Sequence, residues 1–156
     1  MHVLPQRIPV GIPLGSPAAA NPTGEWMKSF MLEAGKRNFR IDFVCVHWYG
    51  GISASAFLAR LKEIHDLYNR PIWITEFAPA DWNATSVVNS KYSKSDILNF
   101  MKEILPALDN LEYVQRYAWF SASETSGPLG NAALFDGSGK LTTLGKFYST
   151  FEGKIN

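Results

Sequence analysis

The sequence predicts an α/β protein with a parallel β-sheet, and three features of the 156 residues point to that class. Short runs of β-branched and aromatic residues alternate with segments whose apolar residues recur at helical spacing. Turn-forming residues gather between these segments. No linker, charge run or low-complexity stretch divides the chain, so residues 1–156 are expected to form one domain. Strands that alternate with helices of this length imply βαβ units and parallel pairing.

Four segments are bounded by turn signals and are predicted as strands: residues 7–17, 41–49, 72–77 and 114–120. The first carries Pro9, Pro13 and Pro17, which restrict it to a sheet edge or an irregular strand. The second is the clearest strand, and Gly50 and Gly51 end it.

Four helices are expected, one after each strand. The first opens at residues 22–25, and its expected apolar stripe is Trp26, Phe30 and Met31. Ser53 can cap the second helix, and Ser93 or Ser95 can cap the third. The last helix is predicted from about residue 143 to residue 151.

Four βα units suit either part of a barrel or an open doubly wound sheet. A complete (β/α)8 barrel typically needs about 250 residues, more than this chain has. A nucleotide-binding doubly wound sheet normally carries a Gly-rich phosphate turn after its first strand. Gly11, Gly15 and Gly24 do not form that pattern, so the sequence does not favour a nucleotide site.

The composition narrows the functional classes. Lys and Arg total 15 against 14 Asp and Glu, which argues against a nucleic-acid partner bound through a basic field. No stretch approaches the roughly 18 apolar residues of a membrane span, and the first residues show no apolar signal-peptide core. Cys45 is the single cysteine, which excludes an internal disulfide, and its apolar neighbours predict inert packing. Aromatic residues make up 13% of the chain, and several stand beside polar residues, as sugar-binding sites require.

Function in parallel α/β sheets lies beyond the carboxyl ends of the strands. By strict alternation, three sets of strand-end side chains each share a face: His47 with Tyr49, Glu76 with Ile72 and Ile74, and Trp119 with Tyr117 and Ser121. Convergence of these faces would surround Glu76 with the ring of Trp119 and the polar groups of His47 and Tyr49.

A carboxylate among rings and hydrogen-bond donors suits sugar chemistry. Such a group can attack an anomeric carbon, while aromatic faces stack on the C–H face of the sugar. Glu76 could instead pair with a nearby Arg or Lys, or cap the following loop. His47 could be a partly buried histidine with satisfied hydrogen bonds, and Trp48 and Trp73 are expected to pack between sheet and helices. Trp82, on a loop with Pro, Asp and Asn, is a candidate sugar platform.

Other motifs carry less chemistry. Glu124, on a Ser/Thr/Gly loop, is expected to be a solvated carboxylate. Asn83-Ala84-Thr85 fits the N-glycosylation pattern, which is common by chance and has meaning in a secreted protein. No cluster of His, Asp and Glu has metal-ligand spacing, and neither GxSxG nor a phosphate-binding P-loop occurs.

Three aromatic motifs occur in a fixed order along the chain. They are Val46-His-Trp-Tyr-Gly50, Pro71-Ile-Trp-Ile-Thr-Glu-Phe-Ala78 and Arg116-Tyr-Ala-Trp-Phe120. In this order the motifs resemble the glycoside hydrolase family 128 catalytic core, also described as the Asl1-like glycosyl hydrolase catalytic domain. The resemblance runs from about Gly11 to Phe151.

The resemblance implies an extracellular or cell-wall (β/α)8-barrel enzyme that cleaves β-1,3-glucan with retention. It would make this chain a parallel (βα)4 half of the barrel, strands five to eight, with Glu76 as the nucleophile at the end of strand seven. The expected substrate-binding residues are His47, Tyr49, Trp82, Trp119 and Ser121. No metal or organic cofactor is expected, because two carboxyl groups suffice for the reaction.

The second carboxyl group is where the chain departs from the family. A retaining glycosidase needs two carboxyl groups about 5–5.5 Å apart. In the family the acid/base Glu ends strand four, usually beside an Asn, and Glu25, at a helix start, does not match that position. The acid/base Glu is therefore expected to be missing from this chain.

A half-barrel would expose strand edges and an apolar inner face. A homo-oligomer or a complementary barrel half is therefore an expected partner, besides the β-glucan or oligosaccharide. Two other interpretations remain open. The chain could be a non-catalytic glucan-binding module, or a structural half-barrel fragment with neither activity.

Overall fold

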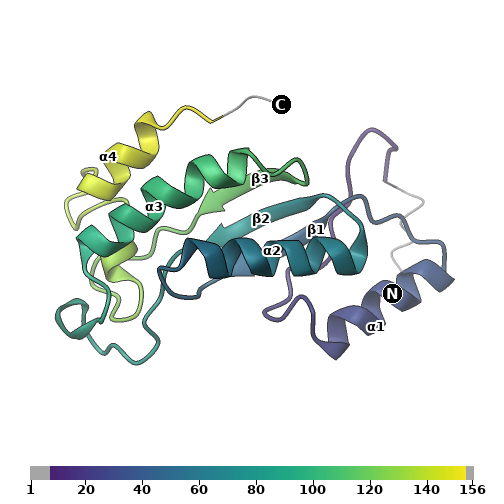
Figure 1. Ribbon diagram of the computed structural model, residues 1–156, viewed down its shortest axis with the longest axis horizontal. Coiled ribbons are helices and arrows are strands. Elements are labelled where there is room, and N and C mark those ends of the chain that lie inside the picture. Colours follow the sequence, from purple (N-terminus) through teal and green to yellow (C-terminus); the bar gives the residue numbers. More distant parts are fainter. Residues whose placement is uncertain (1–7, 154–156) are drawn as a thin grey trace.

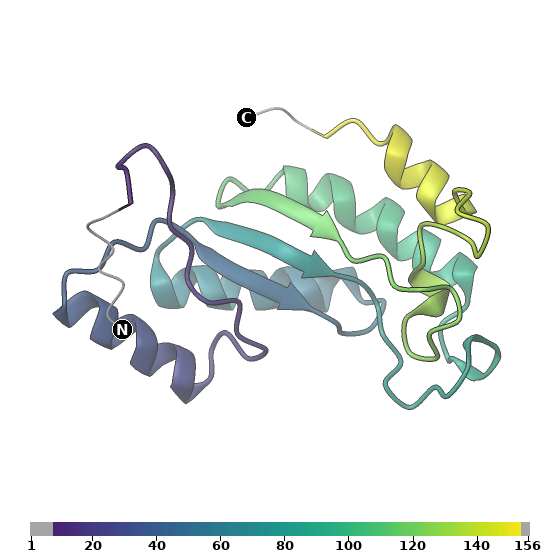
Figure 2. The same cartoon turned by 180° about the vertical axis from the view of Figure 1, so that it is seen from behind.

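The computed structural model describes residues 8–153, which contain a three-stranded sheet packed against helices (Figure 1). The strands are β1 (Val44–Trp48), β2 (Ile72–Phe77) and β3 (Val114–Trp119), and they pair in parallel in the order β1-β2-β3. The expected α/β class and parallel pairing are thereby confirmed. All three strands point toward the same end of the sheet, where the loops after β2 and β3 gather (Figure 2).

The two long helices cover one face of the sheet. They are α2 (Ala54–Tyr68), between β1 and β2, and α3 (Lys94–Asp109), between β2 and β3. Figure 2 shows the opposite face, in front of which no helix of residues 8–153 lies. This uncovered face is called the open face below.

Four shorter elements complete the described chain. Helix α1 (Glu25–Lys36) lies on the β1 side of the sheet, and α4 (Thr143–Thr150) packs near α3 (Figure 1). Single 3₁₀ turns occur at η2 (Val87–Asn89), in the loop after β2, and at η3 (Gly130–Ala132), in the loop after β3.

The predicted first strand is not a regular strand, so the expectation of four strands is wrong by one within residues 8–153. Position 7 lies outside the described residues. The following segment makes only the isolated parallel bridges Gly15–Phe43 and Ala19–Val46, and the Ser16 hydroxyl accepts from the Cys45 N–H of β1 at 3.0 Å. Proline has no backbone N–H, and prolines at three positions leave the segment too few donors for a continuous ladder.

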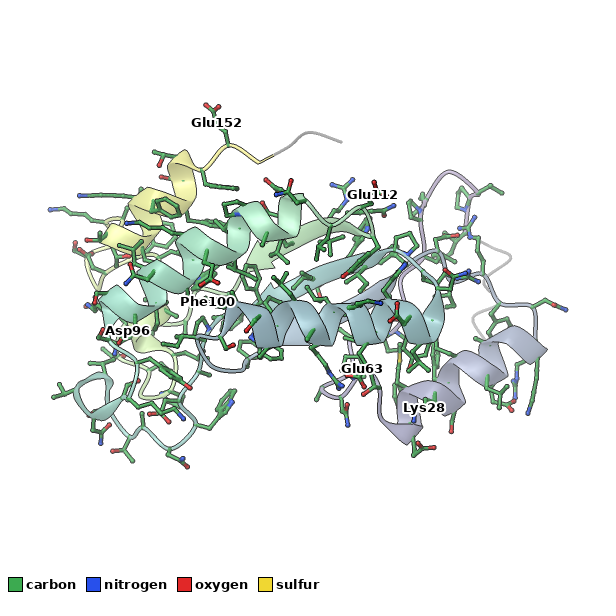
Figure 3. The ribbon with its side chains drawn as sticks, in the orientation of Figure 1. Lys28, Glu63, Asp96, Phe100, Glu112 and Glu152 are labelled. Atoms are coloured by element: carbon green, nitrogen blue, oxygen red, sulfur yellow. The ribbon has the colours of Figure 1, made fainter. Side chains whose placement is uncertain are left out.

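Serine caps set the starts of both long helices. The Ser53 hydroxyl accepts a hydrogen bond from the Ala56 N–H at 3.2 Å, as expected. Of the two candidates for α3, Ser93 is the cap: its hydroxyl accepts from the Asp96 N–H at 3.1 Å. The Asp96 carboxylate accepts in return from the Ser93 N–H at 2.9 Å, which completes a capping box at the first turn (Figure 3).

The hydrophobic core lies between the sheet and the two long helices. Trp48 stacks on Phe57 of α2 with ring centroids 4.7 Å apart, which confirms the expected core position of Trp48. Phe100 of α3, labelled in Figure 3, is 1% exposed and lies in the same core. Residues of β1 and β2 that point toward the helices complete this core. They are Val44, Val46, Ile72, Ile74 and Phe77.

The expected apolar stripe of the first helix holds for Phe30 and Met31, which pack partly buried against the core, but is wrong for Trp26. Trp26 is 63% exposed and stacks on Phe30 at 5.9 Å, on the surface of α1. The residues that α1 buries are Met27 and Ala34, seven positions apart. Two helical turns separate these residues, so one face of the helix packs inward although the largest ring lies outside.

Candidate active site

A shift in strand register determines where Glu76 points. In the pairing of β1 with β2, Val46 lies opposite Ile74, but the next pair is His47 with Glu76. Thr75 is therefore an extra residue in β2, as in a β-bulge, and every side chain after it changes face. As a result Glu76 lies on the open face, whereas Ile74 and Phe77 are buried toward the helices.

The expectation that Glu76 shares a face with Ile72 and Ile74 is therefore wrong, although its gathering with His47 and Tyr49 is confirmed. Strict alternation through six residues assumes an unbroken ladder, and the extra residue breaks that assumption. The sequence gives no composition signal for the bulge, because Thr75 is itself a common strand residue.

Two side chains hold one oxygen of the Glu76 carboxylate. The Tyr49 hydroxyl donates a short hydrogen bond to Oε2, and His47 Nδ1 lies 3.4 Å from the same atom. Within residues 8–153 no hydrogen bond reaches Oε1. The side chain is 37% exposed, so Oε1 belongs to a carboxylate that is oriented by the protein and open to a ligand.

Aromatic rings surround Tyr49 and form the wall beside the carboxylate. Phe120 meets the Tyr49 ring edge-on at 5.5 Å, and Trp82 meets it at 6.0 Å. The Trp82 Nε1–H also donates to the backbone oxygen of Tyr49 at 3.1 Å, and this bond holds the loop after β2 over the end of β1. The exposed part of the Trp82 ring remains free to stack, since 63% of the residue is accessible.

A groove of about 610 Å³ opens beside β1 and adjoins this wall. His47 and Tyr49 line the groove together with Trp82, and the remaining lining comes from β1, from α2 and from the segment before α1. The structure thus brings His47, Tyr49 and Trp82 to one place next to Glu76. Phe120, which the sequence reasoning left out, joins them because it follows the last paired residue of β3.

The expected position of Trp119 beside Glu76 is wrong. Trp119 is 6% exposed, meets Phe77 at 5.1 Å on the helix side of the sheet, and donates from Nε1 to the Ala132 oxygen at 2.9 Å. The bulge explains the error, because it moves Glu76 to the open face while Trp119 stays on the face that packs against α3.

Two further residues lie away from their expected positions. Ser121 does not join the group around Glu76: its hydroxyl accepts from the Leu134 N–H at 3.0 Å, and the residue lines a separate hollow. Trp73 does not pack between sheet and helices. It stacks on Phe43 at 3.8 Å on the open face, and the guanidinium of Arg116 lies 4.8 Å from its ring centroid.

A buried aspartate shapes the loop that carries Trp82. The Asp81 carboxylate, in a residue that is 4% exposed, accepts from the Asn83 N–H at 3.3 Å and from the Lys91 N–H at 2.9 Å. These backbone hydrogen bonds, the one from Lys91 first, hold the pKa of the Asp81 carboxyl below its usual range. Asp81 therefore fixes both ends of the segment between Trp82 and Lys91.

Removal of the Asp81 carboxylate is expected to loosen this segment. In Asp81→Ala, amide hydrogen exchange over residues 82–91 should accelerate about tenfold, because two N–H groups lose their acceptor. Asp136→Ala is the matched control, since Asp136 also binds loop N–H groups, those of Ser138 and Lys140. Equal exchange of residues 82–91 in both variants and the parent would contradict the assignment.

The pKa of Tyr49 links the site to stability at alkaline pH. Burial and the hydrogen bond to Glu76 raise the pKa of Tyr49, and burial and Asp109 raise that of Tyr117. A raised folded-state pKa contributes stability that is full below the unfolded value of about 10 and is lost as the pH rises above it. Between pH 9 and 11, the free energy of unfolding measured in urea should therefore fall less steeply with pH for Tyr49→Phe than for the parent. Identical slopes would contradict a raised pKa of Tyr49.

The sheet presents a carboxylate near the end of its central strand, with a phenol, an imidazole and an indole beside it. This combination is typical of a sugar-hydrolase site. The chain belongs to the glycosyl hydrolase catalytic core family, whose sequence profile matches residues 3–148. The similarity to glycoside hydrolase family 128 is confirmed by the relatives described next.

Three relatives illustrate the similarity. Alkali-sensitive linkage protein 1 of Schizosaccharomyces pombe is 35% identical over 137 residues, which are 86% of this chain and 24% of that protein. A family 128 endo-β-1,3-glucanase of Amycolatopsis mediterranei superposes with a TM-score of 0.75 at 32% identity, over 90% of this chain and 58% of that one. A family 128 exo-β-1,3-glucanase of Cryptococcus neoformans gives a TM-score of 0.72 at 27% identity, over 86% and 53%.

The chain therefore spans about a quarter of the curated relative and little more than half of these solved glucanases. None of the helices in residues 8–153 is both long and apolar enough to cross a membrane. In the same residues, no three His, Cys, Asp or Glu side chains are grouped as a metal ion would require.

Proposed function

We propose that residues 1–156 form part of the single catalytic domain of a retaining β-1,3-glucan hydrolase, with Glu76 as its nucleophile. The placement of Glu76 carries this proposal. Its carboxylate ends the central strand, faces the open side of the sheet, and is held by Tyr49 and His47 through one oxygen only. Strand-end carboxylates at this end of a parallel α/β barrel are where such enzymes keep their chemistry.

In the proposed reaction the free oxygen Oε1 attacks the anomeric carbon of a glucosyl unit. The bond from Oε1 to C1 forms as the bond from C1 to the glycosidic oxygen breaks, and the leaving oxygen takes a proton from a general acid. Water then attacks C1 of the glycosyl ester, passes a proton to the same group, and releases Glu76. The hydrogen bond from Tyr49 orients the carboxylate through both steps.

The ring wall supplies the proposed sugar contacts. Trp82 lines the groove beside Tyr49, and Phe120 meets Tyr49 edge-on; these rings can stack on the C–H face of glucose, and His47 can bond a hydroxyl. Relatives support a β-1,3-glucan substrate: the Amycolatopsis glucanase has been solved with laminaritriose, laminaripentaose and laminarihexaose. Its solved variants replace either of two different glutamates, which supports a mechanism with two carboxyl groups.

The acid/base carboxyl is proposed to come from a strand that this chain does not supply. The groups that contact Glu76 within the described residues are a phenol and an imidazole, neither of which is a carboxyl. In a barrel the chain would supply strands five to eight, and the acid/base Glu would end strand four. We therefore place that group on a complementary half of the barrel.

Two surfaces support such a partner. Within residues 8–153, β3 pairs with β2 alone, so its other edge is open to a further strand except where the Tyr148 hydroxyl accepts from the Trp119 N–H at 3.3 Å. A hollow of about 510 Å³ runs along β3, lined by Trp73 and Arg116 from the open face and by Asp109 and Tyr117 from the helix side. A partner strand on this edge would cover the hollow and continue the sheet.

The proposed place of action is outside the cell or at the cell wall. β-1,3-Glucan is a polymer of that location, and the curated relative is named for an alkali-sensitive linkage. Two carboxyl groups perform the reaction without a metal or an organic cofactor.

A second candidate function is glucan binding without hydrolysis. It is favoured by one observation, namely that Glu76 has a tyrosine and a histidine as neighbours but no carboxyl partner among the described residues. In this alternative the same rings bind glucan and Glu76 bonds sugar hydroxyls. A purely structural fragment would show neither activity.

One assay series separates these functions. Laminarioligosaccharide binding by calorimetry, release of reducing ends from laminarin, and mass by light scattering are measured on the same purified chain. The hydrolase proposal predicts saturable binding, and hydrolysis by the species whose mass includes a partner. Binding without hydrolysis in every assembled species would favour the binding module. Absence of binding would contradict both.

A further inference from the structure

The loop after β2 presents an asparagine that the catalytic proposal does not use. Asn83 is exposed and occupies the third position of a turn that the Ala84 N–H closes onto the Asp81 oxygen at 2.9 Å. Within residues 8–153 its side-chain amide makes no hydrogen bond, although its backbone N–H is bound by Asp81. An exposed and unbonded amide at a turn is open to modification.

The residues after Asn83 complete the acceptor pattern for N-linked glycans. Asn83-Ala84-Thr85 is the one Asn-X-Ser/Thr triplet of the 156 residues in which X is not proline. The other triplet of this form, Asn21-Pro22-Thr23, is blocked by its proline, and the Asn21 carboxamide oxygen accepts a hydrogen bond from Arg60 at 2.7 Å.

We propose that Asn83 is the acceptor of an N-linked oligosaccharide, a modification that rests on the extracellular or cell-wall location proposed above. The Asn83 amide nitrogen forms a bond to C1 of an oligosaccharide carried by a lipid pyrophosphate. The bond from C1 to the pyrophosphate oxygen breaks, the lipid pyrophosphate leaves with the electron pair, and an amide proton passes to a base of the transferase. The product is a glycosyl asparagine.

The fold leaves room for the glycan and fixes where it lies. Ala84 is 5% exposed and anchors the turn, while the residues on either side of it, Asn83 and Thr85, are exposed. Trp82 precedes the acceptor and donates to the Tyr49 backbone oxygen. A glycan on Asn83 therefore stands one residue from the ring wall, at the rim of the proposed glucan groove rather than in it.

The test uses mass rather than activity as its readout. The full chain, with a secretion signal and a C-terminal Asn-Ala-Thr tag, is secreted from a glycosylating eukaryotic host. Molecules that carry a glycan on the Asn of the tag have been exposed to the transferase, and only these molecules are counted. Release with a peptide amidase converts each occupied asparagine to aspartate, which peptide mass spectrometry locates.

The proposal predicts conversion at Asn83 in most tag-occupied molecules. Asn83→Gln and Thr85→Ala should each lose one glycan mass, whereas Thr85→Ser, which keeps the hydroxyl, should retain it. An unmodified Asn83 in molecules with an occupied tag overturns the inference. That result leaves the hydrolase proposal intact, because laminarin hydrolysis and the Glu76 variants are measured on unglycosylated chain.

Discussion

Glu76→Gln is expected to reduce laminarin hydrolysis by at least about a thousandfold. The comparison is made in an assembly that hydrolyses laminarin when it contains the parent chain. The amide keeps the size and hydrogen-bonding capacity of the carboxylate, but it cannot act as a nucleophile at the anomeric carbon. Its oxygen can still accept from Tyr49, so the ring wall keeps its place. Laminarioligosaccharide affinity should therefore stay within about threefold of the parent value, a shift of under 1 kcal/mol.

The matched control for this variant is Glu103→Gln. Glu103 is exposed on α3, on the far side of the sheet from the open face, and the substitution removes the same charge. Hydrolysis by this variant should equal that of the parent. Full turnover by Glu76→Gln would contradict the assignment of the nucleophile, and equal loss in both variants would show a general effect of charge.

Trp119→Ala is expected to reduce the free energy of unfolding by about 3–5 kcal/mol, the usual range for loss of a buried large aromatic side chain. The indole fills the space between Phe77 and Phe100, and its Nε1–H satisfies the buried Ala132 oxygen. Urea unfolding measures the change. Trp119→Phe, which keeps most of the packing, should reduce stability less while leaving laminarioligosaccharide affinity unchanged.

Trp82→Ala is the matched substitution on the other side of the sheet. Because Trp82 is 63% exposed, its loss should change the free energy of unfolding by no more than about 0.5–1 kcal/mol. Its loss should instead weaken laminarioligosaccharide binding. Weaker binding by Trp119→Phe at parental stability would contradict the core position of Trp119.

The sheet and its helices follow from local patterns that the sequence shows directly. Apolar residues at helical spacing predicted α2 and α3, and the side chains of Ser53 and Ser93 start them as capping chemistry requires. The irregular course of residues 8–17 was foreseeable in part, because three prolines remove backbone donors. The outward ring of Trp26 was not, since its packing depends on which face of α1 meets the sheet.

The site shows where pattern reasoning stops. His47 and Tyr49 were placed together correctly, because β1 alternates without interruption up to its end. Trp119 and Ser121 were wrongly predicted to lie beside Glu76. The extra residue Thr75 puts Glu76 on the open face, whereas Trp119 lies on the helix side of the sheet. A bulge arises from the pairing of two strands, which no single strand sequence encodes. Phe120 was overlooked because the alternation argument favoured its neighbours.

Covalent trapping tests the role of Glu76 most directly. A 2-deoxy-2-fluoro-β-laminaribiosyl fluoride carries a leaving group that needs no protonation, so the missing acid/base carboxyl does not prevent the first step. Peptide mass spectrometry should find the fluorinated glycosyl mass on Glu76 in the parent chain and on no residue of Glu76→Gln. A label on another carboxylate, or unlabelled Glu76 in chain that binds laminarioligosaccharides, would contradict the nucleophile assignment.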